Sequence, residues 1–291
     1  MDKISIKIPA TSANLGLGFD SMGLAISKYL YLDASLSSKW QFEYKQDDLA
    51  QLPSGEMNLV AKTAKAIAQR FNKEMPALKV IMTSEIPLTH GLGSSSSAIV
   101  GGIELAKHFL DLNLTEEDKV RLASEIEGHP DNVGPCVTGG AFVGYYDQDL
   151  LVYHQIDFDG VSLILSIPPY EISTQDAREA IPDVYEKDKA VEQNAMNNVM
   201  LLSMIKGDYP TMGQLMMRDQ FHEPYRQPLI KEFQDIKDTA ISQGAYATLI
   251  SGAGPTVLTL CSSDKVSEII EKLKEVVPNC IHEETQVHYN S

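Results

Sequence analysis

A run of glycines and serines over residues 91–97, Gly-Leu-Gly-Ser-Ser-Ser-Ser, places many small donor groups close together. Glycine lets the backbone curl until several amides converge on one anion, and serine hydroxyls add donors and an oxygen that can bind a metal ion. A helix should follow, and its free N-terminal amides would point at the same anion. We therefore predict a phosphate site, although a flexible linker or a helix cap would also explain the run. No Gly-Lys-Ser/Thr follows, so the segment is not a P-loop.

Three further segments are rich in glycine and polar side chains: residues 10–23, 128–135 and 251–256. The first two contain carboxylate, amide and imidazole groups that can bind a polar substrate or move a proton. The third has two glycines followed by Pro255, which is typical of a tight turn between strands, and a plain hairpin turn would explain it equally well. The polar loops resemble parts of one site, which strengthens the prediction of a phosphate site.

The elements expected around these segments alternate between strands and helices. Alternating apolar residues predict an opening strand over residues 4–8 that Pro9 ends, and apolar residues at helical spacing predict a helix over residues 95–110. Further strands are expected near residues 30–45, 78–82, 139–146, 150–158, 162–167, 246–250, 256–261 and 280–288. Further helices are expected near residues 59–71, 115–127, 174–180, 189–206, 210–221, 228–243 and 264–276. This mixture predicts an α+β fold with helices covering an antiparallel sheet.

Size and composition narrow the classes of protein. The 291 residues suffice for two ordinary domains, and we place the boundary near Gly160, between domains 1–159 and 160–291. The 24 basic and 40 acidic residues give a net charge of −16, which argues against nucleic acid and anionic membranes as partners. Three cysteines without a CxxC pair indicate reduced thiols in a cytoplasmic protein. We expect neither a signal peptide nor a membrane span, because no apolar run approaches ~18 residues.

Three segments carry a resemblance to the GHMP kinases, the family of galactokinase, homoserine kinase, mevalonate kinase and phosphomevalonate kinase. Residues 9–16 with Gly18-Phe19-Asp20 resemble the first family motif, residues 87–97 resemble the second, PxxxGLGSSxx, and residues 251–256 resemble the third. The motifs occur in the family order and extend over nearly the whole chain. Their combination is therefore far more specific than any one of them.

Within this family, the chain is most similar to the homoserine kinases. The segments SANLGLGFDSMGLA from Ser12 and EGHPDNVGP from Glu127 carry this similarity. The chain departs from the family pattern at Leu17, where proline is usual, and in GSSSS, where GSSAA is usual. The resemblance implies transfer of the γ-phosphate of ATP, with Mg²⁺, to the side-chain hydroxyl of L-homoserine, giving O-phospho-L-homoserine on the route to threonine.

The resemblance also implies an architecture and leaves two other functions open. It implies an N-terminal ATP-binding α/β domain of the ribosomal protein S5 type, a C-terminal ferredoxin-like α/β sandwich, an active site between them, and a homodimer. The alternatives are another GHMP small-molecule kinase, such as mevalonate kinase, and a non-catalytic ligand sensor on the same fold. Mevalonate has no ammonium group, so the acidic Asp20 and Asp131 would be a liability at its site.

For ATP, the resemblance implies that the glycine-serine loop holds the triphosphate and that Asn58 lies near the adenine, a position that also suits a helix N-cap. The implied loop residues are Pro87, Leu88, Thr89, His90, Gly91, Leu92, Gly93, Ser94, Ser95, Ser96 and Ser97. For Mg²⁺, the resemblance implies Ser94 and one carboxylate at the end of the next helix. Glu125 and Glu127 both lie there, on different faces of the helix, and we expect Glu125 to be the ligand, with Glu127 as the alternative.

An amino-acid substrate needs acceptors for its ammonium group and donors for its carboxylate, ideally the fork of an arginine. The resemblance implies that the substrate-binding residues are Asn14, Asp20, His129, Asp131, Arg178, Arg226, Gly254 and Thr256, although either arginine would also suit a surface ion pair. Among the catalytic candidates, Asn132 would orient the attacking hydroxyl, Asp131 is the reserve base, and His129 orients or caps. We expect positioning and electrostatics to dominate, because a loose phosphoryl-transfer transition state does not demand a strong base.

Overall fold

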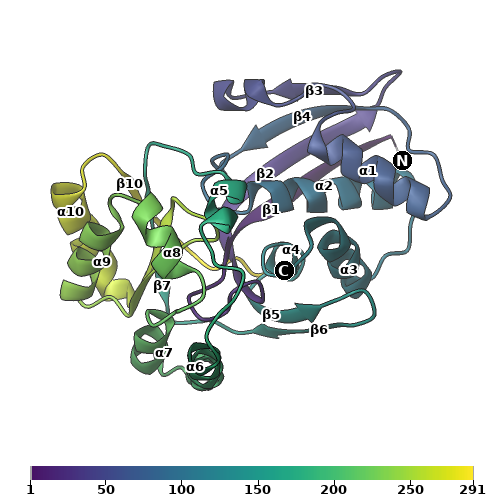
Figure 1. Cartoon of the computed structure of the whole chain (residues 1–291). Coiled ribbons are helices and arrows are strands. Elements are labelled where there is room, and N and C mark those ends of the chain that lie inside the picture. Colours follow the sequence, from purple (N-terminus) through teal and green to yellow (C-terminus); the bar gives the residue numbers. More distant parts are fainter. Residues whose placement is uncertain (1, 291) are drawn as a thin grey trace.

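The computed structural model describes residues 2–290 and contains two β-sheets (Figure 1). The first sheet has the strand order β3 (Gln41–Tyr44), β4 (Leu78–Ser84), β2 (Met22–Leu36), β5 (Ala141–Tyr146) and β6 (Leu151–Ile156), with β1 (Lys3–Ala13) also pairing with β2. The second sheet has the order β10 (Ile281–Thr285), β7 (Ser162–Ile167), β9 (Val257–Cys261) and β8 (Ala247–Ile250). β3 and β4 run parallel, and the second sheet is antiparallel throughout. The α+β prediction is confirmed.

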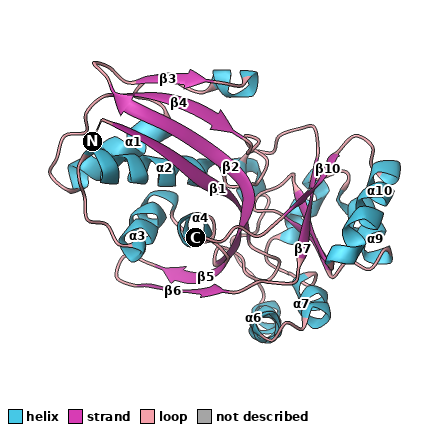
Figure 2. Cartoon of the chain, turned by 180° about the vertical axis from the view of Figure 1, so that it is seen from behind, coloured by secondary structure: helices cyan, strands magenta, loops and turns pink. Residues whose placement is uncertain are grey.

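Four helices accompany the first sheet: α1 (Leu59–Arg70), α2 (Ser94–Phe109), α3 (Glu116–Glu127) and α4 (Val133–Thr138). Figures 1 and 2 show them between the β3–β4 end and the β5–β6 end of the sheet. Two glycines let α2 pack closely on both sides. A Cβ atom at Gly101 would lie 2.7 Å from Leu32 Cδ1, and one at Gly102 would lie 2.7 Å from Val60 O. This close packing explains glycines inside a helix, where each costs up to about 1 kcal/mol.

The helices of the second half lie on both faces of the second sheet. α9 (Phe233–Ser242) and α10 (Val266–Val276) bury one face in a hydrophobic cluster of their own. With the four strands they complete a β-α-β-β-α-β order, the ferredoxin-like arrangement. On the other face, methionines of α6 (Lys187–Ile205) and α7 (Tyr209–Met216) join the core of the first sheet. The hydrophobic core therefore continues from one half of the chain into the other.

Short helical segments connect these elements. They are α5 (Thr174–Glu179), α8 (Glu223–Arg226) and the 3₁₀ turns η1 (Asp47–Gln51), η2 (Gln227–Leu229) and η3 (Ser263–Lys265). After β10 the chain returns to the first half, where Val287 pairs with Ile26 and Tyr289 with Gly139. Because of this return, a boundary near Gly160 stays a proposal. None of the helices within residues 2–290 is both long and apolar enough to cross a membrane.

The structure differs from the expected elements where it matters for the site. Pro9 does not end the first strand: β1 continues to Ala13, and its register against β2 shifts between Pro9 and Ala10. A bulge of this kind accommodates the missing N–H of proline. The helix expected over 210–221 ends at Met216, and the one expected over 228–243 begins at Phe233. The intervening residues form a loop, α8 and η2, and both helical segments are too short to show a helical period.

Candidate active site

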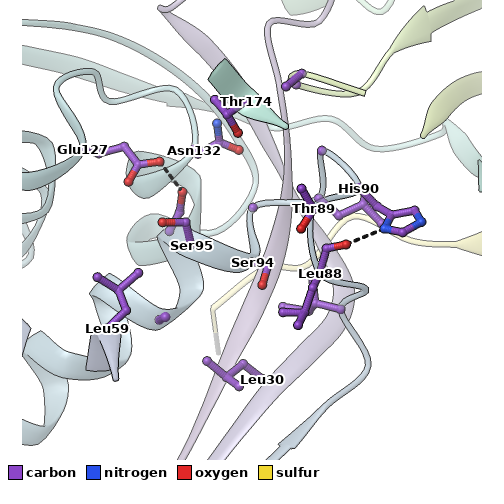
Figure 3. Close-up of a pocket in the computed structure, with 18 of the residues that line it drawn as sticks. Leu30, Leu59, Leu88, Thr89, His90, Ser94, Ser95, Glu127, Asn132 and Thr174 are labelled. Atoms are coloured by element: carbon purple, nitrogen blue, oxygen red, sulfur yellow. Dashed lines mark hydrogen bonds between the residues drawn. The ribbon is translucent and has the colours of Figure 1, made fainter. Parts of the chain in front are cut away.

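A pocket of about 580 Å³ lies between the two halves, at the N-terminus of α2. Figure 3 shows Leu30 and Leu59 at one end and Asn132 and Thr174 at the other, with the start of α2 between them. The apolar end is lined by Leu30, Leu49, Leu52, Met57, Leu59, Met82 and Ile86. The polar end is lined by Asn14, Asp20, Glu127, His129, Asp131, Asn132, Glu171, Thr174, Arg178 and Arg226. One pocket therefore offers an apolar slot, a helix N-terminus and a charged chamber.

The three glycine-rich motifs meet at this pocket. Gly91 has φ +72°, and a Cβ atom there would lie 2.2 Å from the carbonyl oxygen of Ser251, so only glycine allows this approach. Ser251 Oγ lies 2.8 Å from both Gly91 O and Ser12 Oγ. The amide of Thr11 donates to Leu92 O at 3.2 Å. Residues far apart in the sequence are thus fixed against one another by short hydrogen bonds.

The glycine-serine loop presents its amides and hydroxyls to the pocket. Residues 88–96 line it, and Ser94 and Ser95 lie on its wall in Figure 3. Gly93 is the residue before α2, so the free N–H groups of the first helical turn face the same space. Pro87 does not line the pocket, and Ser97 is buried, with its hydroxyl 3.0 Å from Pro9 O and from Gly93 O. The phosphate-binding role proposed for the loop therefore narrows to residues 88–96.

The two candidate carboxylates for the metal lie in different surroundings. Glu127 lines the pocket and accepts a hydrogen bond from Ser96 Oγ at 3.1 Å. Burial raises the pKa of Glu127, and the nearby His129 and Arg178 together with the Ser96 hydrogen bond offset only part of this rise. Glu125 does not line the pocket and pairs instead with Arg70 at 3.0 Å on the surface. This geometry does not support the preference for Glu125, and we transfer the metal proposal to Glu127.

A chain of charged groups crosses the polar end. Arg178 makes a bidentate pair with Asp20 at 3.0 and 3.1 Å, and its Nη2 lies 3.0 Å from His129 Nε2. His129 Nδ1 hydrogen-bonds to the buried Asp131. Burial lowers the pKa of His129, but the hydrogen bond and charge of Asp131 outweigh it and raise the pKa overall. An Arg178 N–H can donate to Nε2 only when that nitrogen carries no proton, so this contact fixes a neutral ring whose proton lies on Nδ1 and faces Asp131.

Arg226 is a buried cation whose hydrogen bonds go to backbone carbonyls. It is 3% exposed, and its guanidinium donates to the carbonyls of Ala177 at 3.1 Å and Gly252 at 2.9 Å. Within residues 2–290 no carboxylate lies at ion-pair distance from it. Burial, and then the charge of Arg178, lower the pKa of Arg226. Because an unpaired buried charge is costly, this pocket-lining guanidinium is suited to an anionic ligand.

Amide side chains fix the loops on which these charges lie. Asn14 donates to Gly252 O at 3.0 Å and accepts the amide of Asp20 at 3.2 Å, which joins the first motif to the third. Asn132 accepts a hydrogen bond from Thr11 Oγ1 at 2.9 Å. Thr11 was not expected at the site, because the first strand was expected to end before it. Its position follows from the continuation of β1 past the proline.

The other expected residues are divided between the pocket and the core. Asn58 lines the pocket while its side chain caps α1 at Val60 N and donates to Tyr44 Oη at 3.1 Å. Gly254 and Thr256 do not line the pocket, and Thr256 is fully buried. Gly252 and Ala253 line it instead, together with Glu171 and Thr174, which the sequence did not single out. The residues of the apolar end also have no sequence pattern that marks them as part of a site, because leucines that line a cavity and leucines of the core have the same spacing and type.

A buried polar cluster lies behind Arg226. The Asp219 carboxylate accepts the amides of His222 and Glu223, both at 2.8 Å, and so fixes the start of α8. His222 Nε2 lies 3.0 Å from Gly16 O, and the Glu223 carboxyl accepts the amide of Ile250 at 2.7 Å. Burial raises the pKa of Glu223 to about 8. The cluster links α8, which carries Arg226, to the first motif and to the strand before the third.

Glu223 makes the stability of the fold depend on pH. Its pKa rises from the usual 4.5 to about 8 on folding, so between these values the folded chain binds more protons than the unfolded one. The stability present below about pH 4.5 is therefore lost as the pH rises through about 8, at roughly 1.4 kcal/mol per unit of pKa difference. Glu223→Gln should flatten this fall, measured as the melting temperature from pH 5 to 8. Parallel curves for the wild type, Glu223→Gln and the exposed control Glu271→Gln would contradict this.

Comparisons with known proteins find relatives over nearly the whole chain. The family models "GHMP kinases N terminal domain" and "GHMP kinases C terminal" match residues 58–140 and 200–279. The homoserine kinase of Staphylococcus haemolyticus is 44% identical over 284 residues, covering 96% of this chain and 93% of that protein. The homoserine kinase of Staphylococcus aureus (strain MSSA476) is 42% identical over 282 residues, covering 95% and 92%.

Solved structures share the fold over the full length. The homoserine kinase of Cytophaga hutchinsonii superposes with a TM-score of 0.87 at 27% identity, covering all of this chain and 96% of that one. The mevalonate kinase of L. major, solved with R-mevalonate, has a TM-score of 0.76 at 19% identity, covering 100% and 98%, and shows likeness of fold alone. Given the two domain models and the identity over nearly the whole chain, this protein belongs to the GHMP kinase family, in its homoserine kinase branch.

Proposed function

We propose that this chain transfers the γ-phosphate of ATP to the side-chain hydroxyl of L-homoserine, giving ADP and O-phospho-L-homoserine. The observation that carries the proposal is the buried guanidinium of Arg226, which forms no salt bridge within residues 2–290 yet lines the same chamber as the Asp20 carboxylate. An amino acid brings one carboxylate and one ammonium group, which match this pair in sign. The chamber opens onto the N-terminus of α2, where a phosphoryl donor would lie.

ATP would lie along the length of the pocket. Its phosphates would meet the amides of residues 88–96 and the first turn of α2, where the local positive potential offsets the overall charge of −16. Its adenine would occupy the apolar end near Asn58. With its oxygen used to cap α1, Asn58 offers the base an N–H donor.

Mg²⁺ fits the oxygen donors at the start of α2. The Glu127 carboxylate and the Ser94 hydroxyl both line the pocket, and hard oxygen ligands are those that Mg²⁺ takes alongside phosphates and water. The Glu127 carboxylate is partly buried and forms no salt bridge within residues 2–290, which supports this assignment. When bound, the ion would neutralise charge on the phosphates.

L-Homoserine would displace an internal ion pair on entry. Its carboxylate would bind Arg226 and Arg178, and its ammonium group would take over the Asp20 carboxylate that Arg178 now holds at 3.0 Å. Asn132 would orient the hydroxyl toward the γ-phosphate, and Asp131 would hold His129 beside it. In this scheme the residues bind and align the two reactants, and proton removal is secondary.

The alternatives fit the charges less well. Mevalonate would leave the Asp20 carboxylate without a partner once Arg178 turned to the substrate, which is unfavourable in a partly buried chamber. A non-catalytic sensor would have no need for a partly buried Glu127 that lines the pocket at the start of α2. We also propose a cytoplasmic homodimer with domains 1–159 and 160–291, as the family resemblance implies.

The decisive assay measures ADP release from ATP with each alcohol. We expect turnover with L-homoserine that depends on Mg²⁺, and background rates with mevalonate. Turnover of mevalonate but not homoserine would overturn the choice of substrate. Absence of turnover with every alcohol, together with tight binding of homoserine by calorimetry, would favour the sensor.

A further inference from the structure

Phe19 lies between Gly18 and Asp20 in the loop that joins β1 to β2. The amide of Gly18 donates to Asn14 O at 3.0 Å, and the amide of Met22 donates to Gly18 O at 2.9 Å. The next residue, Asp20, is bound through its amide to Asn14 Oδ1. Hydrogen bonds therefore fix the backbone on both sides of Phe19, and its side chain begins beside the charged chamber.

Both arginines of the chamber lie over the ring of Phe19. The guanidinium carbon of Arg226 lies 5.4 Å from the ring centroid, and that of Arg178 lies 5.9 Å from it. Cations within about 6 Å of an aromatic face are attracted to it, most strongly where water is excluded. The only carboxylate that either guanidinium contacts within residues 2–290 is Asp20, which pairs with Arg178. The ring face therefore offsets part of the repulsion between the two like charges.

The buried His222 packs against the ring of Phe19. The two rings are stacked, with centroids 5.3 Å apart and planes 19° from parallel. His222 is fully buried, with Nε2 hydrogen-bonded to Gly16 O, and its carbonyl accepts the amide of Arg226 at 3.1 Å. The histidine thus connects the loop that carries Phe19 to the helix that carries Arg226.

We propose that Phe19 is a positioning residue: its ring is the platform that holds the guanidinium groups of Arg178 and Arg226 side by side, so that their N–H donors converge on the substrate carboxylate. This rests on the proposed function, because it assigns the carboxylate of the amino acid to these arginines. Phe19 touches neither ATP nor the reacting oxygen in this arrangement. Its electrostatic contribution should therefore appear in KM for homoserine and much less in kcat or in KM for ATP.

A fluorination series separates this role from simple packing. Fluorine on the ring weakens the negative face with little change in shape, so replacing Phe19 by 3,5-difluorophenylalanine and then 3,4,5-trifluorophenylalanine should raise KM for homoserine stepwise, to about tenfold. Phe19→Tyr keeps an aromatic face and should stay close to wild type. The exposed Phe71→Leu is the control for loss of a phenylalanine elsewhere.

A substrate without the carboxylate tests the assignment directly. Phe19→Leu should reduce kcat/KM for L-homoserine by about tenfold more than for 3-aminopropan-1-ol, which lacks only that carboxylate. If the wild type phosphorylates homoserine but the fluorinated variants all keep the wild-type KM, the platform is wrong and the proposed function stands. Equal losses on both substrates would also overturn the platform. A wild type that fails to phosphorylate homoserine would instead remove the proposed function.

Discussion

Glu127→Gln is expected to lower kcat by about 10²–10⁴-fold, whereas Glu125→Gln, two residues earlier on α3, should stay within about twofold of wild type. The reason is position. Glu127 faces the pocket beside Ser96, and a catalytic metal supplies several kcal/mol of charge stabilisation. Glu125 pairs with Arg70 on the surface, where such pairs contribute little.

The amide variant keeps the hydrogen-bond acceptor toward Ser96, so the fold should survive. Its melting temperature, measured without nucleotide, checks this. The second measurement is the Mg²⁺ dependence of binding of a non-hydrolysable ATP analogue by calorimetry, which Glu127→Gln should weaken and Glu125→Gln should not. If Glu125→Gln were the variant that lost turnover, the assignment of the two carboxylates would be reversed.

The comparison of these two glutamates also shows where sequence information ends. Their spacing predicts that they lie on different faces of a helix, which is correct, but not which face meets the pocket. That depends on how α3 rotates against α2, a property of tertiary packing. The resemblance of the three glycine-rich motifs to those of the GHMP kinases, by contrast, implies that they meet at one site, and the structure places them in contact.

Other parts of the site depend on distant contacts that no local pattern contains. Arg178 and Asp20 are 158 positions apart, and their pairing exists only because the second half packs against the first. The apolar end of the pocket consists of residues that also suit a hydrophobic core. Residue type therefore cannot distinguish a side chain that lines the pocket from one that packs in the core. Pro9 is a local signal that misleads, because a bulge lets β1 continue through it and place Thr11 at the site.

Arg226→Met should reduce kcat/KM for L-homoserine by about 10³-fold, and Arg226→Lys by about 10²-fold. A charge-assisted hydrogen bond contributes about 1.5–3 kcal/mol, and lysine keeps the charge but not the fork. With 3-aminopropan-1-ol as substrate, the loss should be far smaller. The exposed Arg218→Met, eight residues earlier, is the control and should keep wild-type kinetics.

The stability of Arg226→Met provides a second, independent test of the role of Arg226. The buried guanidinium of Arg226 hydrogen-bonds to two carbonyls and forms no ion pair within residues 2–290, so its burial carries a desolvation cost that an apolar side chain of similar length would remove. If Arg226 is kept for the substrate, Arg226→Met should therefore have an unchanged or higher melting temperature while losing turnover of homoserine. If Arg226 instead serves the fold, the variant should melt lower and its KM for homoserine should stay near wild type. The two measurements move in opposite directions under the two roles, so together they decide whether the buried charge is there for the ligand.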